Sequence, residues 1–148
     1  MKTLVNKTVL PVNISEAWQF FSSPKNLSKI TPKHMNFKIT TDVLDNDTYA
    51  GQIISYRVSP LPWLRTTWIT EITQVAREQF FIDEQRVGPY KIWHHEHYFK
   101  ALSPNKTEMV DRVFYELPFY AKPLSAFIDK KVADIFQYRE TVLNTLFR

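Results

Sequence analysis

The feature that most constrains the fold is one long amphipathic pattern near the end of the chain. From about residue 122 to 147, apolar side chains recur at the 3.6-residue spacing of an α-helix. The stripe consists of Leu124, Ile128, Val132, Ile135, Val142 and Leu146, broadened by Phe127, Phe136 and Leu143, with Lys130, Lys131, Asp134, Gln137 and Glu140 on the outer face. Such a helix is ~39 Å long. Its apolar stripe has to be buried against a partner of similar length.

The preceding sequence predicts that partner, because most of it alternates apolar and polar residues with a period of two. Strands are expected at about 2–10, 36–41, 50–59, 63–75, 79–86, 91–102 and 107–117. Turns or loops are expected at Asp45-Asn46-Asp47, Pro60-Leu61-Pro62, Val87-Gly88-Pro89-Tyr90 and Ser103-Pro104-Asn105-Lys106. Connections this short favour antiparallel pairing of successive strands in a meander.

Two short helices are predicted between the first and second strands. Ser15 is placed to cap a helix that runs through Phe21, and Ser23-Pro24 opens another that reaches about Ile30. Thr31-Pro32 ends the second helix, since a residue before proline avoids the α region. The predicted architecture is α+β, with a seven-stranded curved antiparallel sheet wrapped around the long C-terminal helix in a single domain, 1–148.

Composition excludes several classes of function. The only glycines are Gly51 and Gly88, so neither a dinucleotide-binding loop nor a Walker-type phosphate loop can form. The absence of cysteine excludes disulfides, thiolate zinc sites, iron–sulfur clusters and cysteine nucleophiles. The formal net charge of +4 is spread along the chain, and no nucleic-acid partner is expected. No secretion signal or membrane-spanning run is evident, so we expect a cytoplasmic protein without stable membrane association.

Three consecutive strands place polar side chains among large apolar ones on a single face. By alternation this face carries Phe81, Asp83 and Gln85, then Trp93, His95, His97 and Phe99, then Met109, Asp111, Val113, Tyr115 and Leu117. Inward polar groups cost free energy unless they are paired. An apolar pocket with a few convergent polar groups is typical of a small-molecule site. The sequence therefore predicts such a site between the sheet and the C-terminal helix.

Two motifs and the order of elements resemble a known superfamily. The motifs are Phe20-Phe21…Leu27…Ile30-Thr31-Pro32 and Phe81-x-Asp83-x-Gln85-x-x-Gly88-Pro89-Tyr90-x-x-Trp93-x-His95-x-His97-x-Phe99, followed by Asp111-Arg112-Val113-x-Tyr115-x-Leu117-Pro118. Over essentially the whole chain they resemble START-like, or SRPBCC, proteins of the bacterial polyketide cyclase/dehydrase and lipid-transport type. This resemblance implies a helix-grip fold with a deep cavity for a hydrophobic ligand. It implies no particular reaction, because the superfamily includes carriers, receptors and cyclases.

We therefore expect the protein to bind a small hydrophobic or amphipathic molecule between sheet and helix, as a carrier or sensor. No cofactor is expected, and the oligomeric state is left open. The candidate ligand-binding residues are Tyr56, Trp68, Phe81, Asp83, Gln85, Trp93, His95, His97, Phe99, Asp111, Tyr115, Ile128, Val132 and Ile135.

Two alternatives use the same polar cluster. In the first, a cyclase or dehydratase uses His95 or His97 as a base, oriented by Asp83 or Asp111. Tyr56 or Tyr115 then donates to the substrate oxygen. In the second, the two histidines and one of these carboxylates chelate a transition metal that supports a metal-dependent activity. Two arginines, Arg112 and Arg139, could bind a carboxylate of the ligand, but we expect both to form solvated ion pairs.

Overall fold

The structure is a computed structural model of the 148-residue chain that describes residues 1–42 and 48–148. The first part contains β1 (Lys2–Leu10), α1 (Ile14–Phe21), α2 (Pro24–Leu27) and the 3-10 turns η1 (Ser28–Ile30) and η2 (Lys33–Met35). The sheet continues with β2 (Lys38–Ile39), β3 (Ile53–Leu61), β4 (Leu64–Ala76), β5 (Phe80–Val87), β6 (Ile92–Ser103) and β7 (Lys106–Glu116). The 3-10 segment η3 (Phe119–Leu124) then leads into α3 (Ser125–Leu146).

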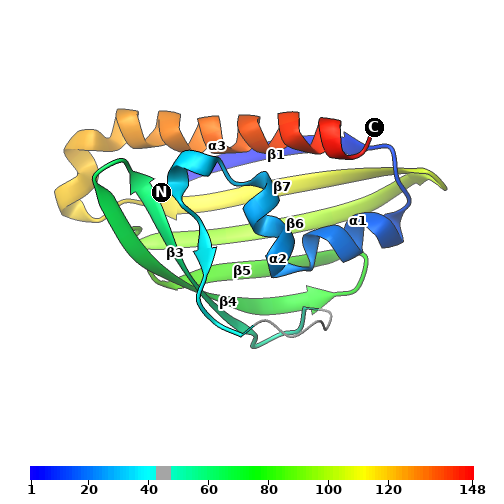
Figure 1. The fold of residues 1–148 in the computed structure, drawn as a ribbon, viewed down its shortest axis with the longest axis horizontal. Coiled ribbons are helices and arrows are strands. Elements are labelled where there is room, and N and C mark those ends of the chain that lie inside the picture. The colour runs from blue at the N-terminus through cyan, green and yellow to red at the C-terminus, as the bar shows by residue number, and fades with distance from the viewer. Residues whose placement is uncertain (43–47) are drawn as a thin grey trace.

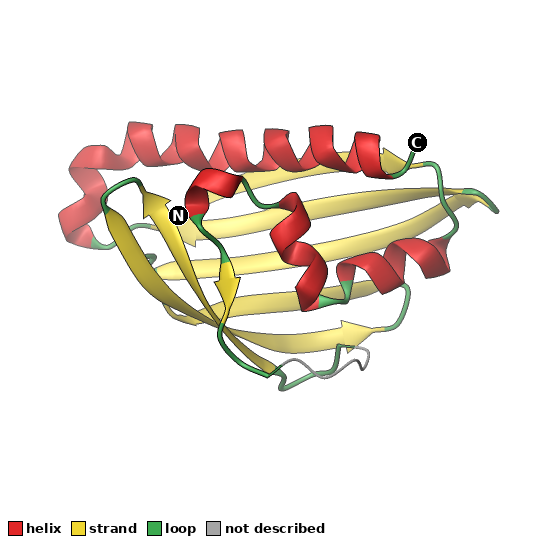
Figure 2. Cartoon of the chain, viewed as in Figure 1, coloured by secondary structure: helices red, strands yellow, loops and turns green. Residues whose placement is uncertain are grey.

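The strands form one antiparallel sheet in the order β1-β7-β6-β5-β4-β3-β2, which confirms the predicted fold class. The chain returns at its end to the strand with which it began, since β1 pairs with β7 along its whole length. Figure 1 shows α3 lying along the sheet, with α1 and α2 crossing the same face further down. In Figure 2 the strands curve around these helices, so the sheet forms one layer and the helices form the other.

Two apolar clusters join the layers. Around Trp18 of α1, the rings of Phe81 and Phe99 pack edge-on, with centroids 5.9 and 5.4 Å away, and Leu143 of α3 completes this cluster. The second cluster joins α3 to β7 through Val113, Tyr115, Val132 and Phe136. The helix is therefore anchored on the β1–β7 side of the sheet.

The predicted cap of α1 was wrong by two residues. The N-cap is Asn13, whose side-chain oxygen accepts a hydrogen bond from the backbone N–H of Glu16 at 2.9 Å. Its backbone is extended, as capping requires. Ser15 lies one residue inside the helix and donates its hydroxyl to Glu78 instead.

The long helix begins three residues later than predicted. Lys122 and Pro123 lie in η3, and α3 starts at Ser125. Proline has no N–H to donate and fits poorly within a helix, which explains the tighter turn before Ser125. The apolar stripe also extends beyond the packed part of the helix, because Leu124 and Leu146 at its two ends are exposed.

The expected Pro60-Leu61-Pro62 loop is shorter than predicted. Pro60 and Leu61 belong to β3, where the pairing with β4 shifts register between Val58 and Leu61. An irregularity of this kind is where a strand tolerates proline. The predicted Asp45-Asn46-Asp47 turn lies outside the described residues.

Candidate functional site

A cavity of about 630 Å³ lies between the sheet, α3 and the α1–α2 segment. Its wall is largely apolar and aromatic, and the following candidates from the sequence lie in it: Tyr56, Trp68, Phe81, Asp83, Trp93, His95, His97, Ile128 and Ile135. Further lining comes from segments that strand alternation did not single out, such as Phe20, Phe21, Ile30 and Met35 near the two short helices. The role of each residue in binding stays a prediction.

Gln85 has a structural role next to the cavity. Its side-chain amide donates to the backbone carbonyl of Tyr90 at 2.6 Å and accepts from the N–H of the same residue at 3.1 Å. The side chain therefore closes the β5–β6 turn and presents Tyr90 to the cavity wall. Gln85 is not among the residues that line the cavity, and its role in binding stays a prediction.

Four other candidates also lie behind the wall. Phe99 packs in the first apolar cluster and Val132 in the second. The hydroxyl of Tyr115 donates a hydrogen bond to Asp129 of α3 at 2.6 Å. Asp111 is almost fully buried beneath the histidines and is not part of the lining. Strand alternation for Phe99, Asp111 and Tyr115, and the helical stripe for Val132, correctly gave an inward direction. Neither pattern carries information on how closely the helix layer packs on the sheet.

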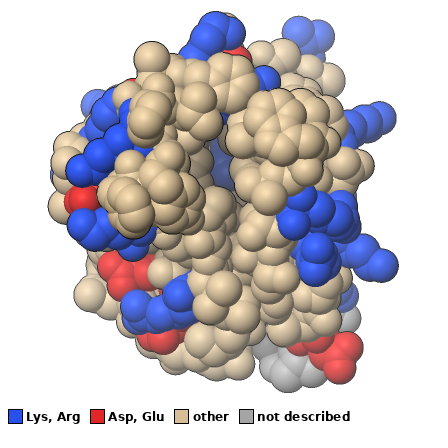
Figure 3. Space-filling view, turned by 90° about the vertical axis from the view of Figure 1, so that its left-hand side faces the viewer, with Lys and Arg blue, Asp and Glu red and all other residues tan. Residues whose placement is uncertain are grey.

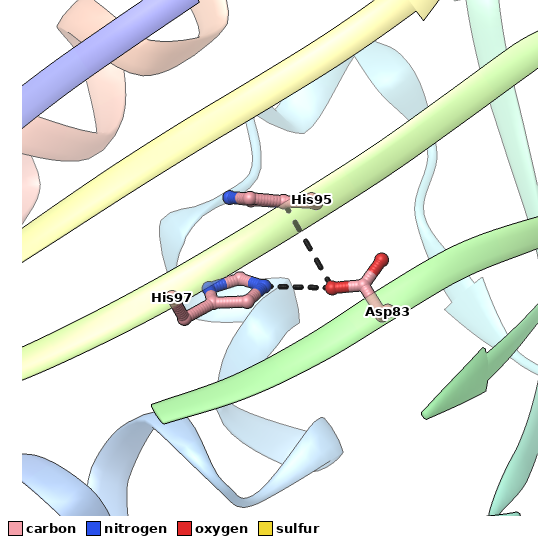
Figure 4. A group of neighbouring side chains, drawn as sticks. All are labelled: Asp83, His95 and His97. Carbon is pink, nitrogen blue, oxygen red and sulfur yellow. Dashed lines mark hydrogen bonds and ion pairs between the residues drawn. The ribbon is translucent and has the colours of Figure 1, made fainter. Parts of the chain in front are cut away.

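The polar cluster is built by cross-strand register. Asp83 of β5 is paired with His95 of β6, and His97 of β6 is paired with Asp111 of β7. The side-chain bonds run diagonally, with His95 Nε2 donating to Asp111 Oδ1 at 2.7 Å and His97 Nε2 donating to Asp83 Oδ2 at 2.6 Å. Figure 4 shows the two imidazoles one above the other beside Asp83.

Stacking holds the imidazoles in this arrangement. The ring centroids of His95 and His97 are 3.7 Å apart, and Phe81 stacks on the other face of His97 at 4.0 Å. Each carboxylate therefore sees both rings, since Asp83 Oδ2 also lies 3.9 Å from His95 Nδ1 and Asp111 Oδ1 lies 3.4 Å from His97 Nδ1. The four side chains form one electrostatic unit.

Arg139 completes this unit, and its predicted role as half of a solvated ion pair was wrong. The side chain is 8% exposed, lines the cavity, and reaches Asp111 Oδ1 from α3 at 3.3 Å. The available signal was its position three residues after Phe136 and four before Leu143, within the apolar stripe. Arg112 does form the expected partly exposed ion pair, with Glu96.

Burial and mutual contact set the protonation of the cluster. Burial alone would raise the pKa of Asp83 and Asp111, but hydrogen bonds from His97 and His95 respectively, with nearby positive charge, hold both well ionised. Burial and the neighbouring His97 lower the pKa of His95. Burial also opposes charging of His97, yet its contacts with Asp111 and Asp83 raise its pKa. The cluster therefore places two carboxylates beside Arg139, with His97 easier to protonate than a free imidazole and His95 harder to protonate.

The same side chains include a possible set of metal ligands. Asp83, His95 and His97 each offer one ligand atom, and these atoms lie within 4.8 Å of one another. Two imidazoles and a carboxylate suit a divalent transition metal. An ion there would have to replace the 2.6 Å hydrogen bond between His97 and Asp83. The donor set is thus compatible with a metal, although the same side chains are already paired with one another or with Asp111 through hydrogen bonds.

One end of the cavity opens between exposed aromatic residues. Trp63 at the β3–β4 turn is 75% exposed, and Phe119 and Tyr120 of η3 are 82% and 71% exposed. Leu64 and Tyr120 also line the cavity, so these two segments form its rim. Lys131, predicted on the outer face of the helix, lines it as well. Figure 3 looks onto this end and shows a hollow between uncharged side chains, with lysines and arginines around it.

A curved sheet gripping one long helix over an apolar cavity defines the helix-grip fold, which the START-like resemblance implied. Solved structures agree over nearly the whole chain. Protein Ms6760 from Mycobacterium smegmatis is 16% identical, with a TM-score of 0.70 over 97% of this chain and 89% of that one. The Zhui aromatase/cyclase from a Streptomyces species is 11% identical, with a TM-score of 0.70 over 99% of this chain and 91% of that one.

A third similar structure is the di-domain ARO/CYC protein BexL of a biosynthetic pathway. It is 12% identical, with a TM-score of 0.70, and the match covers 97% of this chain and 45% of that one. No protein-family model and no curated protein matches the sequence. No helix among the described residues is long and apolar enough to cross a membrane. At these identities the comparisons establish the fold.

Proposed function

We propose that this protein binds a small hydrophobic or amphipathic molecule in the cavity between the sheet and α3, as a carrier or sensor. The observation that carries the proposal is the cavity itself. Its volume of about 630 Å³ lies within the range typical of small-molecule sites, ~300–1,000 Å³. A chain of this size gains stability by filling its interior, so a cavity this large is retained at a cost to packing. A ligand that fills it explains that cost.

The chemistry of the wall supports an amphipathic ligand. Aromatic rings dominate one side, with Trp68 between Tyr56 and Trp93 at centroid distances of 5.9 and 5.4 Å. Flat rings offer large contact areas at low conformational cost. The buried histidine–aspartate unit adds polar groups at one place in the wall. The structural similarity to proteins named as aromatase/cyclases supports a small organic molecule rather than a macromolecule.

The proposal is tested by filling the cavity. Ile135→Trp places an indole in the wall, whereas Ala133→Trp makes the same change two residues earlier at an exposed position of α3. Binding of the neutral fluorescent probe N-phenyl-1-naphthylamine is measured for the wild type and both variants. We expect Ile135→Trp to weaken binding at least tenfold and Ala133→Trp to leave it unchanged. Equal binding by all three proteins contradicts the proposal.

Native mass spectrometry of gently purified protein complements this test. An excess of a few hundred daltons over the denatured mass identifies an endogenous organic ligand directly. We expect the excess to decrease in Ile135→Trp and to persist in Ala133→Trp. An excess that is the same in both variants shows that the bound molecule lies elsewhere.

A second candidate is acid–base catalysis on the bound molecule. The specific observation is His95, which lines the cavity, has a lowered pKa because of burial, and has its Nε2 held by Asp111. A neutral imidazole oriented by a carboxylate is the arrangement of a general base. Here His95→Gln should still bind the co-purified ligand but no longer convert it chemically. Chromatography and mass spectrometry of the ligand measure the conversion. Conversion at an unchanged rate contradicts catalysis and leaves the carrier proposal intact.

A further inference from the structure

Three side chains that line the cavity hold potential metal-ligand atoms close together. Asp83 Oδ2 lies 2.6 Å from His97 Nε2 and 3.9 Å from His95 Nδ1. In a tetrahedral site with metal–ligand bonds of ~2.1 Å, the ligand atoms are roughly 3.4 Å apart. The observed separations of 2.6 and 3.9 Å lie on either side of this value. An ion can therefore be coordinated after modest rotations of these side chains.

The hydrogen bond behind His95 leaves its Nδ1 available as a ligand. Nε2 lies 2.7 Å from Asp111 Oδ1, and because a carboxylate only accepts hydrogen bonds, Nε2 carries the proton. In the neutral imidazole the other nitrogen then has a lone pair. This is Nδ1, the atom on the side of Asp83. Histidines that bind metals usually donate their second N–H to a carboxylate or carbonyl in this way, which fixes the tautomer and orients the ring.

His97 has a carboxylate next to each of its two nitrogens. Nε2 faces Asp83, while Nδ1 is buried, has no hydrogen-bond partner and lies 3.4 Å from Asp111 Oδ1. A neutral imidazole has one proton, so one of its nitrogens directs a lone pair at a carboxylate. A metal ion on Nε2 removes this conflict, because the proton then lies on Nδ1 and faces Asp111. Asp111 is thus placed as the outer acceptor for both histidines.

The charges and the position of the cluster also favour a cation. In the described part of the chain, the cluster contains the carboxylates Asp83 and Asp111 and one arginine, Arg139, which lies 3.3 Å from Asp111. Two carboxylates beside one guanidinium favour a further positive charge. Asp83 and both histidines line the cavity, whereas Asp111 lies behind them. An ion bound on the side of Asp83 is therefore on the side of the cavity.

From these observations we infer a metal site: Asp83 Oδ2, His95 Nδ1 and His97 Nε2 bind a divalent transition-metal ion that keeps an open coordination position toward the cavity. Two imidazoles and one carboxylate suit divalent zinc, iron, cobalt or nickel. The inference goes beyond the proposed function, because the three ligands come from the protein and no hydrophobic molecule is required. Such an ion, when bound, supplies a Lewis acid for an oxygen of a molecule in the cavity.

Zinc binding tests the site without any organic ligand. Untagged protein, freed of metal by dialysis against EDTA, competes for Zn²⁺ with the indicator 4-(2-pyridylazo)resorcinol at pH 7.5. We expect one tightly bound Zn²⁺ per chain. His97→Gln keeps an N–H donor next to Asp83 but removes the imidazole. It should weaken zinc binding about 100-fold or more, since loss of an outer-shell partner alone costs 10–100-fold.

His94→Gln is the matched control. His94 precedes His95 on β6, and its ring nitrogens lie next to Glu84 and Glu96 instead of the cavity cluster. We expect this variant to bind Zn²⁺ as the wild type does. Loss of binding in His94→Gln but not in His97→Gln places the ion at these glutamates and overturns the inference.

Cobalt reports on the open position. Co²⁺ bound to nitrogen and oxygen ligands has visible absorption bands, and azide shifts them where it can bind the ion directly. We expect the bands of the Co²⁺-loaded wild type to shift when azide is added. Bands that azide leaves unchanged overturn the open position toward the cavity.

The remaining outcomes also decide. A wild type that binds Zn²⁺ no more tightly than His97→Gln shows that a second proton satisfies His97, and it overturns the metal site. Circular dichroism checks the fold of each variant. If His97→Gln does not fold, Asp83→Asn decides, because it keeps the shape of the side chain and removes its charge: an undiminished zinc affinity in that variant overturns the inference. Binding of the naphthylamine is measured separately, so the metal site and the proposed function can fail independently.

Discussion

Asp111 lies directly behind His95, with its Oδ1 2.7 Å from the imidazole Nε2 and with a side chain that is almost fully buried. One carboxylate oxygen therefore serves both a histidine of the sheet and Arg139 of α3, which it meets at 3.3 Å. A single aspartate thus connects the sheet and α3 through side-chain contacts directly behind the cavity wall.

Asp111→Asn is expected to be strongly destabilising. It removes the charge that compensates Arg139 and the histidine pair, and breaking a buried ion pair costs ~3–5 kcal/mol. The free energy of unfolding in urea measures the loss. Asp134→Asn is the matched control, because Asp134 pairs with Lys130 on the exposed face of α3 and such pairs contribute ~0.5 kcal/mol or less. Equal effects of the two substitutions contradict the role assigned to Asp111.

Stability should depend on pH through His97. The folded protein raises the pKa of His97, so its proton contributes stability that is complete below the unfolded value of ~6.5 and is lost as the pH rises through the folded value. We expect the free energy of unfolding of the wild type, minus that of His97→Gln, to fall between pH 6 and pH 9. His34→Gln, at a residue exposed in η2, is the control. A difference that stays constant or rises over this range contradicts the assignment of the proton to His97.

The β5–β6 turn should show strong coupling between Gly88 and Gln85. A Cβ on Gly88 would lie 2.4 Å from Gln85 Oε1, and that amide cannot move without giving up its bonds to the Tyr90 backbone. We expect Gly88→Ala to destabilise the wild type by about 1–3 kcal/mol. In a Gln85→Ala background the same change should cost much less. A double-mutant cycle measures the coupling, and strictly additive effects argue against this steric account.

The first helix offers a matched pair of cap substitutions. Asn13→Ala removes the side chain that accepts from the Glu16 N–H and should cost ~1 kcal/mol. Ser15→Ala removes only an exposed hydrogen bond to Glu78 and should cost ~0.5 kcal/mol or less. Thermal unfolding ranks the two variants. A larger loss of stability for Ser15→Ala than for Asn13→Ala would indicate that Ser15 is the capping residue.

The sequence predicted the sheet well because periodicity depends on local residues. The alternation through Trp93, His95 and His97 correctly placed the histidines on one face, and their bonds to Asp83 and Asp111 follow from strand register. The pattern along one strand gives direction, and an antiparallel meander then determines which residues become neighbours.

The depth of each inward side chain relative to the cavity could not be predicted in the same way. Whether an inward side chain faces a cavity or another layer depends on where α3 crosses the sheet, and this is a non-local property. Phe99 and Phe81 share the alternating pattern, yet Phe99 packs against Trp18 without reaching the cavity and Phe81 does both. Arg139 was assigned to solvent because of its charge, although its helical position points inward. A charged residue in an apolar stripe is the one local sign of such a site.

The two ends of the cavity differ, because one has an exposed aromatic rim and the other has the buried Arg139. Ile128 and Arg139, both in its wall, are separated by about 16 Å along α3. A molecule that lies along this wall therefore has about this length of helix to contact before it reaches the rim. Each methylene that stays inside adds ~0.8 kcal/mol of affinity, and each one beyond the rim adds little. We expect affinity in a homologous series of alkyl probes to rise with chain length and to level off once the chain reaches the rim.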